Sequence, residues 1–406
     1  MRDRICIVCG RPLGEAPLMT LTDMPASAQD IPAGEELEEE QGITLSLHQC
    51  ESCGLVQFDC EPVAYYKDVI RSGGFTTTMV NLRKSQYRHF IDGYHLEGKK
   101  LIEAGCGQGE FLSVLSEFPV KAYGIENRES LVCLAKEKGL TVWKQFAEEG
   151  EVFTADDGSV SGPFDGFLSF NFLEHQPDPV GMLRCIADNL SEEGVGLITV
   201  PSLEYILQYD GYYELIRDHL AYYTFDTLRY AAEMAGFQVM EEEMVNRDTL
   251  SVIVRKRKQE ATENNRKQKA GQPENDRKQK AVDISGLKES LDTIGRELEE
   301  LTGRLRDQGK SLAIWGASHQ GFTLASTTVI GRFARYMIDS APFKQGKYAP
   351  ASHLPIVPPD HYHKDPVDAI LIVAPGYTDE IAGIIQEKFG RNIEILALKS
   401  NHLERI

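Results

Sequence analysis

Four cysteines near the start of the chain stand in two C-x2-C pairs, Cys6 with Cys9 and Cys50 with Cys53, and a glycine follows each pair. Four thiolates on two tight turns suit tetrahedral zinc, and the glycine lets each turn bend so that backbone amides face the sulfurs. Forty residues separate the pairs, whereas compact ribbons use about 15–20. We expect a closed, structural zinc site on these four cysteines; unpaired thiols are the alternative.

A glycine-rich turn follows the apolar run Leu101-Ile102 and reads Glu103-Ala104-Gly105-Cys106-Gly107-Gln108-Gly109. Glycines here let a ligand approach the backbone closely at the start of a helix. Further along, the apolar segment 122–125 ends in the carboxylate of Glu126, which can hold both hydroxyls of a ribose. Dinucleotide-binding folds use related turns, so these two features indicate a nucleoside ligand without naming it.

The apolar segment 164–170 leads to Asn171 and then to Leu173-Glu174-His175. With the glycine turn and Glu126, this order resembles the class I S-adenosylmethionine-dependent methyltransferases. The resemblance implies that an acidic residue lies beside the methionine moiety and its ammonium group, that three glycines approach the cofactor, that a carboxylate binds the ribose, and that one further residue lies near the cofactor. In that order the residues are Glu103; Gly105, Gly107 and Gly109; Glu126; and Asn171. In many related enzymes the Leu-Glu-His segment is structural or only lines the cofactor, so a chemical role for His175 is the less favoured alternative.

The flanking segments narrow the resemblance. The four-cysteine module, the methyltransferase core, and residues 340–348 and 353–359 are together similar to C-methyltransferases that act on nucleotide-linked deoxysugars. The likeness spans nearly the whole chain apart from the charged segment that follows the core. It implies that a ketosugar is deprotonated beside its carbonyl and that the carbanion takes the methyl group.

In that family the base is the histidine of a Glu-His-Leu-x-Tyr-Phe segment, which here reads Asp218-His219-Leu220-Ala221-Tyr222-Tyr223. The resemblance makes His219 the candidate base, with Asp218 and Tyr222 beside it. Imidazole titrates near neutral pH, and a neighbouring carboxylate can orient it or stabilise its charged form. Without the resemblance, a histidine at a helix start is more often a polar surface residue.

The chain departs from the family pattern at Ile216, where enzymes acting on deoxysugar ketones usually carry a tyrosine three residues before the histidine. The identity of the sugar therefore stays open, whereas the methyl transfer does not depend on this residue. Several nearby tyrosines can supply the missing hydroxyl, although most are expected to be packing residues: Tyr209, Tyr212, Tyr213, Tyr222 and Tyr223.

A second glycine-bearing turn, 314–321, follows a strand-like run in the C-terminal part of the chain. It is either a simple strand-to-helix connection or a site where backbone amides, Ser318 and His319 face the diphosphate of a nucleotide-linked substrate. Lys344 and Lys347 would add positive charge there.

The 406 residues exceed what one hydrophobic core supports, and the contents of 42% hydrophobic and 26% charged residues are those of globular proteins. A net charge of −19 argues against a nucleic-acid partner and favours a small molecule. The chain shows no signal segment and no apolar run of about 20 residues. We therefore expect a cytoplasmic location, no membrane contact and reduced cysteines.

Around these motifs, apolar runs alternate with helical segments between residues 99 and 256 and again after residue 310, which predicts two α/β units, the first with a parallel sheet. Apolar residues spaced three and four apart over 284–305 form one helical stripe. We expect it to pack on a neighbouring domain rather than form a coiled coil. The charged segment 257–283 predicts a linker, with a solvated helix as the alternative, and the acidic run 35–40 predicts a solvated loop.

We therefore predict an α/β protein with a class I, Rossmann-like methyltransferase core. It comprises a zinc-binding module (1–65), the core (66–256), a charged linker (257–283) and a helix plus a smaller α/β domain (284–406). S-adenosylmethionine and zinc are the expected cofactors, a nucleotide-linked small molecule the expected substrate, and a monomer or homodimer the expected state. The alternatives are a methyltransferase acting on carbon, oxygen or nitrogen of a non-sugar metabolite, and a non-catalytic scaffold that binds the cofactor. The intact glycine turn and its two carboxylates argue against a scaffold.

Overall fold

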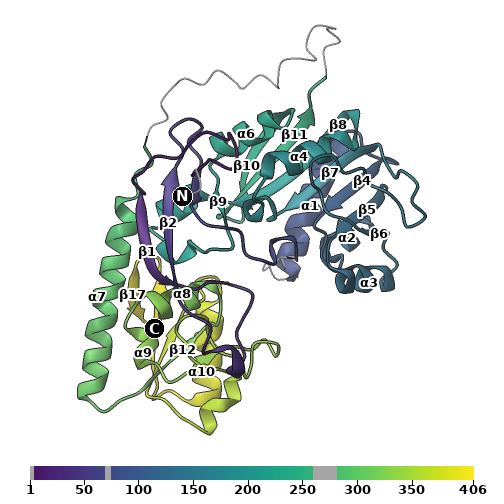
Figure 1. Cartoon of the computed structure of the whole chain (residues 1–406). Coiled ribbons are helices and arrows are strands. Elements are labelled where there is room, and N and C mark those ends of the chain that lie inside the picture. The colour runs from purple at the N-terminus through teal and green to yellow at the C-terminus, as the bar shows by residue number, and fades with distance from the viewer. Residues whose placement is uncertain (1–3, 69–74, 259–280) are drawn as a thin grey trace.

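The computed structural model describes residues 4–68, 75–258 and 281–406. Residues 259–280, most of the predicted linker, lie outside the described residues. Figure 1 shows the N-terminal strands, the central α/β core and the C-terminal domain as three parts, with the N-terminal strands in contact with both of the others.

The N-terminal part is a four-stranded antiparallel sheet in the order β1-β2-β3-β9. The first three strands are β1 (Met19–Met24), β2 (Ile43–Gln49) and β3 (Val56–Phe58). The fourth, β9 (Ala221–Tyr222), comes from the far end of the core sequence. The N-terminal part is therefore completed by residues that directly follow the candidate base.

The core is built on a seven-stranded sheet in the order β10-β11-β8-β7-β4-β5-β6. Five strands are parallel: β4 (Lys100–Ala104), β5 (Lys121–Glu126), β6 (Val142–Lys144), β7 (Phe164–Phe170) and β8 (Leu190–Pro201). The last two, β10 (Phe237–Val245) and β11 (Thr249–Lys256), form an antiparallel hairpin. The prediction of a parallel sheet is confirmed for the five strands and wrong for the hairpin, because the short 246–248 turn returns the chain directly and only an antiparallel pair can be joined so tightly.

Helices follow most of the core strands. They are α1 (Thr77–Gly93), α2 (Glu110–Leu115), α3 (Glu129–Glu137), α4 (Pro179–Asp188), α5 (Leu203–Gln208) and α6 (Phe225–Met234). The 3-10 helix η3 (Leu173–His175) follows β7, and η4 (Tyr212–Glu214) follows α5. The strand order changes direction at β4, whose neighbours are β5 and β7. Ligands of open α/β sheets bind at the carboxyl ends of the strands around such a point.

The C-terminal part begins with the long helix α7 (Ser285–Asp307), which runs beside the N-terminal strands and the C-terminal domain in Figure 1. Its apolar stripe is buried in one cluster with side chains of both parts, such as Leu21 and Leu312, so the prediction of packing on a neighbouring domain is confirmed. No helix among the described residues is long and apolar enough to cross a membrane.

A sheet in the order β14-β13-β12-β15-β16-β17 follows, and all but β17 run parallel. The strands are β12 (Leu312–Trp315), β13 (Met337–Ile338), β14 (Ile356–Val357), β15 (Ala369–Ile372), β16 (Glu394–Lys399) and β17 (His402–Arg405). The helices are α8 (His319–Thr327), α9 (Ile330–Phe333) and α10 (Thr378–Phe389). The second α/β unit is confirmed.

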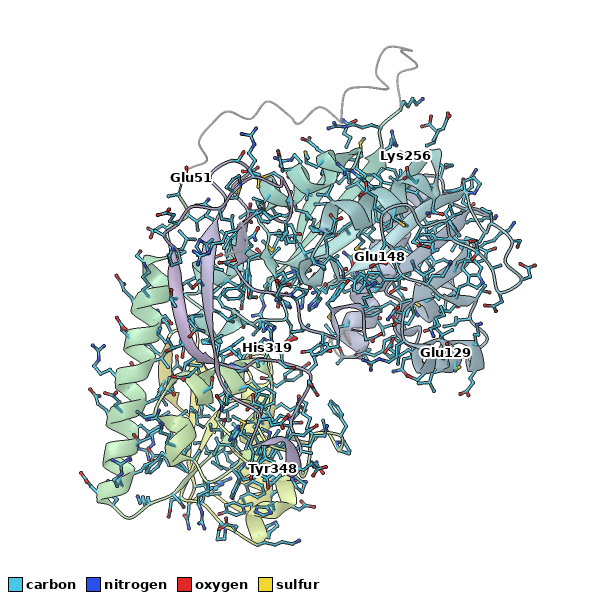
Figure 2. All side chains as sticks on the ribbon, in the orientation of Figure 1. Glu51, Glu129, Glu148, Lys256, His319 and Tyr348 are labelled. Atoms are coloured by element: carbon cyan, nitrogen blue, oxygen red, sulfur yellow. The ribbon has the colours of Figure 1, made fainter. Side chains whose placement is uncertain are left out.

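The connection between β1 and β2, which carries the 3-10 turn η1 (Gly34–Glu36), reaches across to the C-terminal domain. Glu40 Oε2 accepts hydrogen bonds from the Ala351 amide at 2.9 Å and from His353 Nε2 at 2.7 Å. The Tyr348 amide, labelled in Figure 2, donates to the Pro32 carbonyl at 3.0 Å. The expectation of a solvated loop is wrong for Glu40, whose side chain is 15% exposed, because it binds the neighbouring domain.

Candidate active site

The four predicted zinc ligands lie together and are buried. Sγ of Cys6 is 3.5 Å from Sγ of Cys53, Sγ of Cys9 is 3.5 Å from Sγ of Cys50, and all four sulfurs lie within 4.8 Å of one another. Zinc–sulfur bonds of about 2.3 Å in a tetrahedron place the sulfurs about 3.8 Å apart. The donor set therefore fits zinc. The wide sequence gap is accommodated because strands β1 and β2 fill it.

Each cysteine pair sits in the same backbone turn. The Gly10 amide donates to the Cys6 carbonyl at 2.9 Å, and the Gly54 amide donates to the Cys50 carbonyl at 2.8 Å. Both glycines have positive φ, 69° and 83°, which side chains other than glycine rarely adopt. Hydrogen bonding with Cys53 lowers the pKa of Cys50, whereas hydrogen bonding with Cys50 raises the pKa of Cys6 and of Cys53, so the four thiols share their protons as one coupled cluster.

The glycine turn lies at the carboxyl end of β4, beside β5 and β7. Gly105, Gly107 and Gly109 all have positive φ. A Cβ on Gly105 would stand only 3.2 Å from the ring of Phe172, so glycine is needed there for both conformation and space. Glu103, the residue before the last of β4, is fully buried.

Glu126 closes the turn from β5. One carboxylate oxygen accepts from the Gly107 amide at 2.9 Å and the other from the Arg128 amide at 2.9 Å. Burial raises the pKa of Glu126, and these amides oppose the rise. The two hydrogen bonds fix the carboxylate at the mouth of the turn, where a ribose would lie.

A cavity of about 210 Å³ opens at this point. Glu126 and Gly105 line it, and so do six residues that the sequence did not single out: Lys67, Asn127, Gln145, Phe146, Ala147 and Phe172. The Phe146 and Phe172 rings stand edge to face with centroids 5.8 Å apart, which gives a planar heterocycle an aromatic wall. Their position after β6 and β7 was the available signal, since residues at these strand ends meet at one sheet edge.

Asn171 follows β7 with a positive φ of 48°. Its amide donates to the Thr199 carbonyl at 2.8 Å, and its Oδ1 accepts from the Thr199 hydroxyl at 2.9 Å. Asn171 thereby fixes the start of the segment that runs past Phe172 to Glu174 and His175.

That segment meets the candidate base. The Leu220 amide donates to the Glu174 carbonyl at 2.8 Å, and His175 Nδ1 donates to the Asp218 carbonyl at 2.6 Å. The rings of His175 and His219 lie edge to face with centroids 4.9 Å apart. The residues at the cofactor cavity and the candidate base are thus joined through one short stretch of chain.

Burial, followed by the charges of His175 and His319, lowers the pKa of His219 well below its usual value. Burial likewise lowers the pKa of His175 to about 4. Both rings are therefore neutral near pH 7, and a neutral imidazole is the form that can accept a proton.

The Asp218 carboxylate points toward the N-terminal part. Its Oδ1 accepts from the Ala28 amide at 2.6 Å, and its Oδ2 accepts from the hydroxyl of Tyr65. Ser27 and Tyr65 hydrogen-bond each other through their hydroxyls at 2.6 Å. Sequence reasoning missed Tyr65, which brings a phenol close to the candidate base from a segment remote in sequence.

The nearby tyrosine hydroxyls have structural partners. Tyr222 accepts from the Ile216 amide at 2.7 Å and donates to the Ile216 carbonyl at 3.1 Å, and these two hydrogen bonds close a loop. We call residues 216–223, which carry the candidate base, the candidate segment. Tyr213 donates to the Ser400 carbonyl at 2.7 Å, and Tyr212 lies 3.3 Å from the Thr327 hydroxyl. Tyr65, by contrast, donates to the Asp218 carboxylate.

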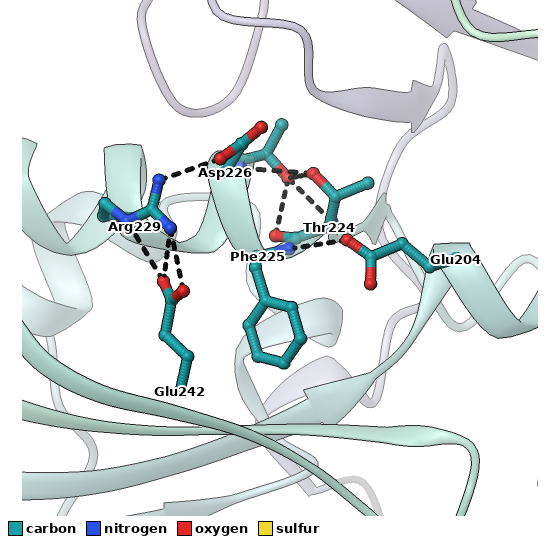
Figure 3. Close-up of polar contacts among 7 residues, drawn as sticks. Glu204, Thr224, Phe225, Asp226, Arg229 and Glu242 are labelled. Atoms are coloured by element: carbon teal, nitrogen blue, oxygen red, sulfur yellow. Dashed lines mark hydrogen bonds and ion pairs between the residues drawn. The ribbon is translucent and has the colours of Figure 1, made fainter.

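The chain leaves the site through α6, and Figure 3 shows how that exit is fixed. Thr224 caps the helix in a reciprocal arrangement with Thr227, and the Phe225 amide donates to Glu204 at 3.2 Å. Arg229 binds both Glu242 and Asp226. The helix therefore starts at a defined point directly after the candidate segment.

A second cavity of about 200 Å³ lies where the three parts of the chain meet. Its lining comes from the β1–β2 connection, the candidate segment and α8: Pro25, Ala28, Ile216, Arg217, His319, Phe322 and Thr323. Figure 2 shows His319 at this junction. His319 Nε2 is 3.1 Å from Glu214 Oε2, and Gln320 Nε2 donates to Glu214 at 2.5 Å, which ties α8 to the core.

Two family models match the chain in succession: a methyltransferase domain over residues 80–242 and a C-methyltransferase C-terminal domain over residues 248–396. The chain is an S-adenosylmethionine-dependent methyltransferase whose C-terminal domain is of the C-methyltransferase type. The C-methyltransferase NovU of Streptomyces niveus is 24% identical over 291 residues, which cover 70% of this chain and 68% of that protein.

Other matches cover a smaller share of the chain. A ubiquinone biosynthesis O-methyltransferase of Methylococcus capsulatus is 36% identical over 93 residues, 22% of this chain and 37% of that protein. The magnesium protoporphyrin IX methyltransferase of Synechocystis PCC 6803, solved with bound SAH, gives a TM-score of 0.35 and 16% identity over 46% of this chain and 90% of that one. The class I fold of this C-methyltransferase rests on its family match and its sheet order.

Proposed function

We propose that this C-methyltransferase methylates a carbon next to the carbonyl of a nucleotide-linked sugar, and that His219 removes the proton from that carbon. The observation that carries the proposal is the cavity shared by the candidate segment, the β1–β2 connection and α8. It adjoins Asp218 through Ala28, which lines the cavity and donates to the carboxylate. A substrate there lies between the core and the C-terminal domain.

The lining of this cavity suits a deoxysugar. Pro25, Ala28, Ile216 and Phe322 supply apolar surface for carbons that lack hydroxyls. Arg217, His319 and Thr323 offer polar groups. Thr323 is fully buried, and its Oγ1 lacks a hydrogen-bond partner within the described residues, which leaves it ready to bind a substrate hydroxyl.

The nucleotide part of the substrate is assigned to the carboxyl edge of the C-terminal sheet. Ser318 caps α8 there, and a Cβ on Gly316 would meet the Val373 carbonyl at 2.4 Å, so only glycine lets β12 and β15 end this close together at the turn. Lys344 Nζ donates to the Ala317 carbonyl at 2.8 Å and pairs with Asp339 Oδ2 at 3.1 Å, so a lysine and its carboxylate partner stand at the same turn. Backbone amides at a helix start together with a lysine favour a diphosphate.

The residues of the first cavity fit S-adenosylmethionine. Glu126 is placed for the ribose, Phe146 and Phe172 for the adenine, and buried Glu103 for the ammonium group. When bound, the cofactor supplies an electrophilic methyl group on its sulfonium. We also propose one structural zinc on the four cysteines.

His219 provides the activation that a carbon nucleophile needs, because an unactivated C–H bond is far too weak an acid. The ring takes the proton, the electron pair passes to the carbonyl as an enolate, and the carbon then bonds to the methyl group. A positioned base contributes typically about 10²–10⁴ in rate. His319 and Arg217 line the substrate cavity, where they can bind negative charge on the substrate.

The test is the exchange of the substrate's α-proton in deuterium oxide in the presence of the demethylated cofactor, which reports deprotonation alone. Candidate dTDP-linked ketodeoxysugars are the probe. We expect His219→Ala to lower the exchange by about 10² or more and to leave calorimetric cofactor binding unchanged. Equal exchange by wild type and His219→Ala would show that another group is the base.

A further inference from the structure

We infer that Glu174, rather than Asp218, is the carboxylate that stabilises the positive charge His219 acquires on taking a proton, and that neutral His175 holds this pair in place. The inference rests on the proposed role of His219 and adds a residue that the family resemblance did not assign. Glu174 acts through His219, so it is a positioning residue.

Glu174, His175 and His219 form one cluster at the end of η3. Their ligand-type atoms all lie within 4.8 Å of one another, and Glu174 Oε1 is 3.8 Å from His175 Nε2. Glu174 is 1% exposed and His175 5% exposed. Charges at such distances interact strongly when they are shielded from water.

The hydrogen bond of His175 fixes where its proton sits. A backbone carbonyl can only accept, so the contact with the Asp218 carbonyl at 2.6 Å places the hydrogen on Nδ1. In the neutral ring, Nε2 is then an acceptor. It faces a carboxylate oxygen of Glu174, which is an acceptor too when ionised. Two acceptors on one side attract a donor, and protonated His219 carries N–H on both ring nitrogens.

The Asp218 carboxylate already binds groups of the N-terminal part of the chain. Its two carboxylate oxygens accept from the Ala28 amide and from the Tyr65 hydroxyl. Burial raises the pKa of Asp218, and these two contacts oppose the rise. Its carboxylate thus fixes the β1–β2 connection, which lines the substrate cavity, to the candidate segment.

The other charged and titratable groups near His219 come from three directions. His175 and Glu174 face it from η3, His319 from α8 of the C-terminal domain, and Tyr222 from β9. His175 and His319 disfavour a charge on His219, and so does burial. Glu174 is therefore the acidic group in the η3 cluster that can offset a charge appearing on His219 during the reaction.

A backbone hydrogen bond holds the Glu174 segment next to the segment that carries His219. The Leu220 amide donates to the Glu174 carbonyl at 2.8 Å, so the backbone beside the base is tied directly to the carboxylate residue. Phe172, two residues before Glu174, lines the cofactor cavity. The cluster therefore lies between the cofactor cavity and the candidate segment, where a proton must be removed.

The test compares Glu174→Gln with Glu174→Asp, which keeps the charge, and with Glu204→Gln, a control that alters a helix-capping contact away from the cluster. NMR of histidine labelled with ¹⁵N gives the pKa of His219 without any substrate. We expect Glu174→Gln to lower this pKa relative to the wild type and Glu174→Asp to restore most of it. An unchanged pKa in Glu174→Gln overturns the inference.

Exchange of the α-proton provides the second measurement. Glu174→Gln should lower the plateau exchange rate about tenfold or more, shift the acid limb of the rate profile to lower pH, and leave KM unchanged. Exchange like that of the wild type overturns the inference. If His219→Ala also exchanges normally, the proposed base is wrong as well, so the two failures are distinguished.

A bound metal is the competing explanation for the same three side chains. Elemental analysis of wild type and Glu174→Gln is expected to find equal metal content. A second metal ion present in the wild type and lost in Glu174→Gln would replace the inference with a metal site.

Discussion

Val56, three residues after Cys53, pairs with Tyr222, three residues after His219, across strands β3 and β9. The Phe58 amide also donates to the Leu220 carbonyl at 3.0 Å. The second cysteine pair and the candidate base therefore belong to the two ends of one short antiparallel pairing. The proposed zinc site is therefore linked to the base through the pairing of β3 with β9, whereas the cavity at the glycine turn is built on β4, β5 and β7.

Removing the zinc should therefore affect cofactor binding and deprotonation of the substrate differently. We expect the apoprotein to bind S-adenosylmethionine with nearly unchanged affinity and to lose α-proton exchange, because β3 no longer holds β9 once the cysteine turns unfold. Calorimetry measures the first property and exchange in deuterium oxide the second. Cys53→Ser should behave like the apoprotein, and Cys60→Ser, outside the cluster, like the wild type. An apoprotein with full exchange would contradict this coupling.

The parts of the site that local sequence encodes were predictable. The glycine turn, Glu126 and the four cysteines each depend on a strand or turn whose signal is contained in a few neighbouring residues. The pairing of Glu174 with His219 was not, because η3 and the candidate segment meet only through tertiary hydrogen bonds such as that from His175 to Asp218. A carboxylate adjacent in sequence to a histidine is an easier inference than one brought there by the fold.

The same reason explains Tyr65 and the fate of the acidic run. Tyr65 reaches Asp218 from 153 positions away in sequence. Glu40 reaches His353 from 313 positions away. Composition predicts an acidic run to be solvated, but a single carboxylate within it can find a partner on another domain. The predicted boundary between the N-terminal module and the core is crossed for the same reason, because β9, which belongs to the core sequence, completes the N-terminal sheet.

Glu126 provides a direct test of the cofactor cavity. Replacing the buried carboxylate that we propose binds two ribose hydroxyls by an amide should weaken S-adenosylmethionine binding about 10- to 100-fold, since hydrogen bonds to charged groups contribute about 1.5–3 kcal/mol. Calorimetry with Glu126→Gln measures the change. Glu129→Gln is the matched control, because its side chain is 67% exposed and pairs with Lys144 on the surface. Equal affinity of Glu126→Gln and the wild type would place the ribose elsewhere.

The buried histidine beside the base predicts how stability depends on pH. Burial lowers the pKa of His175 to about 4, whereas an unfolded histidine titrates near about 6.5. The unfolded chain therefore binds more protons than the folded chain below pH 6.5. By linkage, stability decreases as pH falls from about 6.5 toward 4, and at pH 5.5 the loss from this residue is about 1 kcal/mol relative to neutral pH.

Chemical unfolding at several pH values between 7.5 and 5.5 measures this loss. Trp143 fluorescence in a Trp315→Phe background follows the core, since Trp143 lies on β6 and Trp315 on β12. His175→Asn should flatten the pH dependence by about 1 kcal/mol between these limits. His402→Asn should leave it unchanged, because that side chain is 60% exposed. Asp218 and His219 also titrate, so the comparison of slopes between variant and wild type isolates His175. Parallel slopes for the wild type and His175→Asn would show that the pKa of His175 is the same in the folded and unfolded chains, and His175 would then not be the neutral acceptor that faces Glu174.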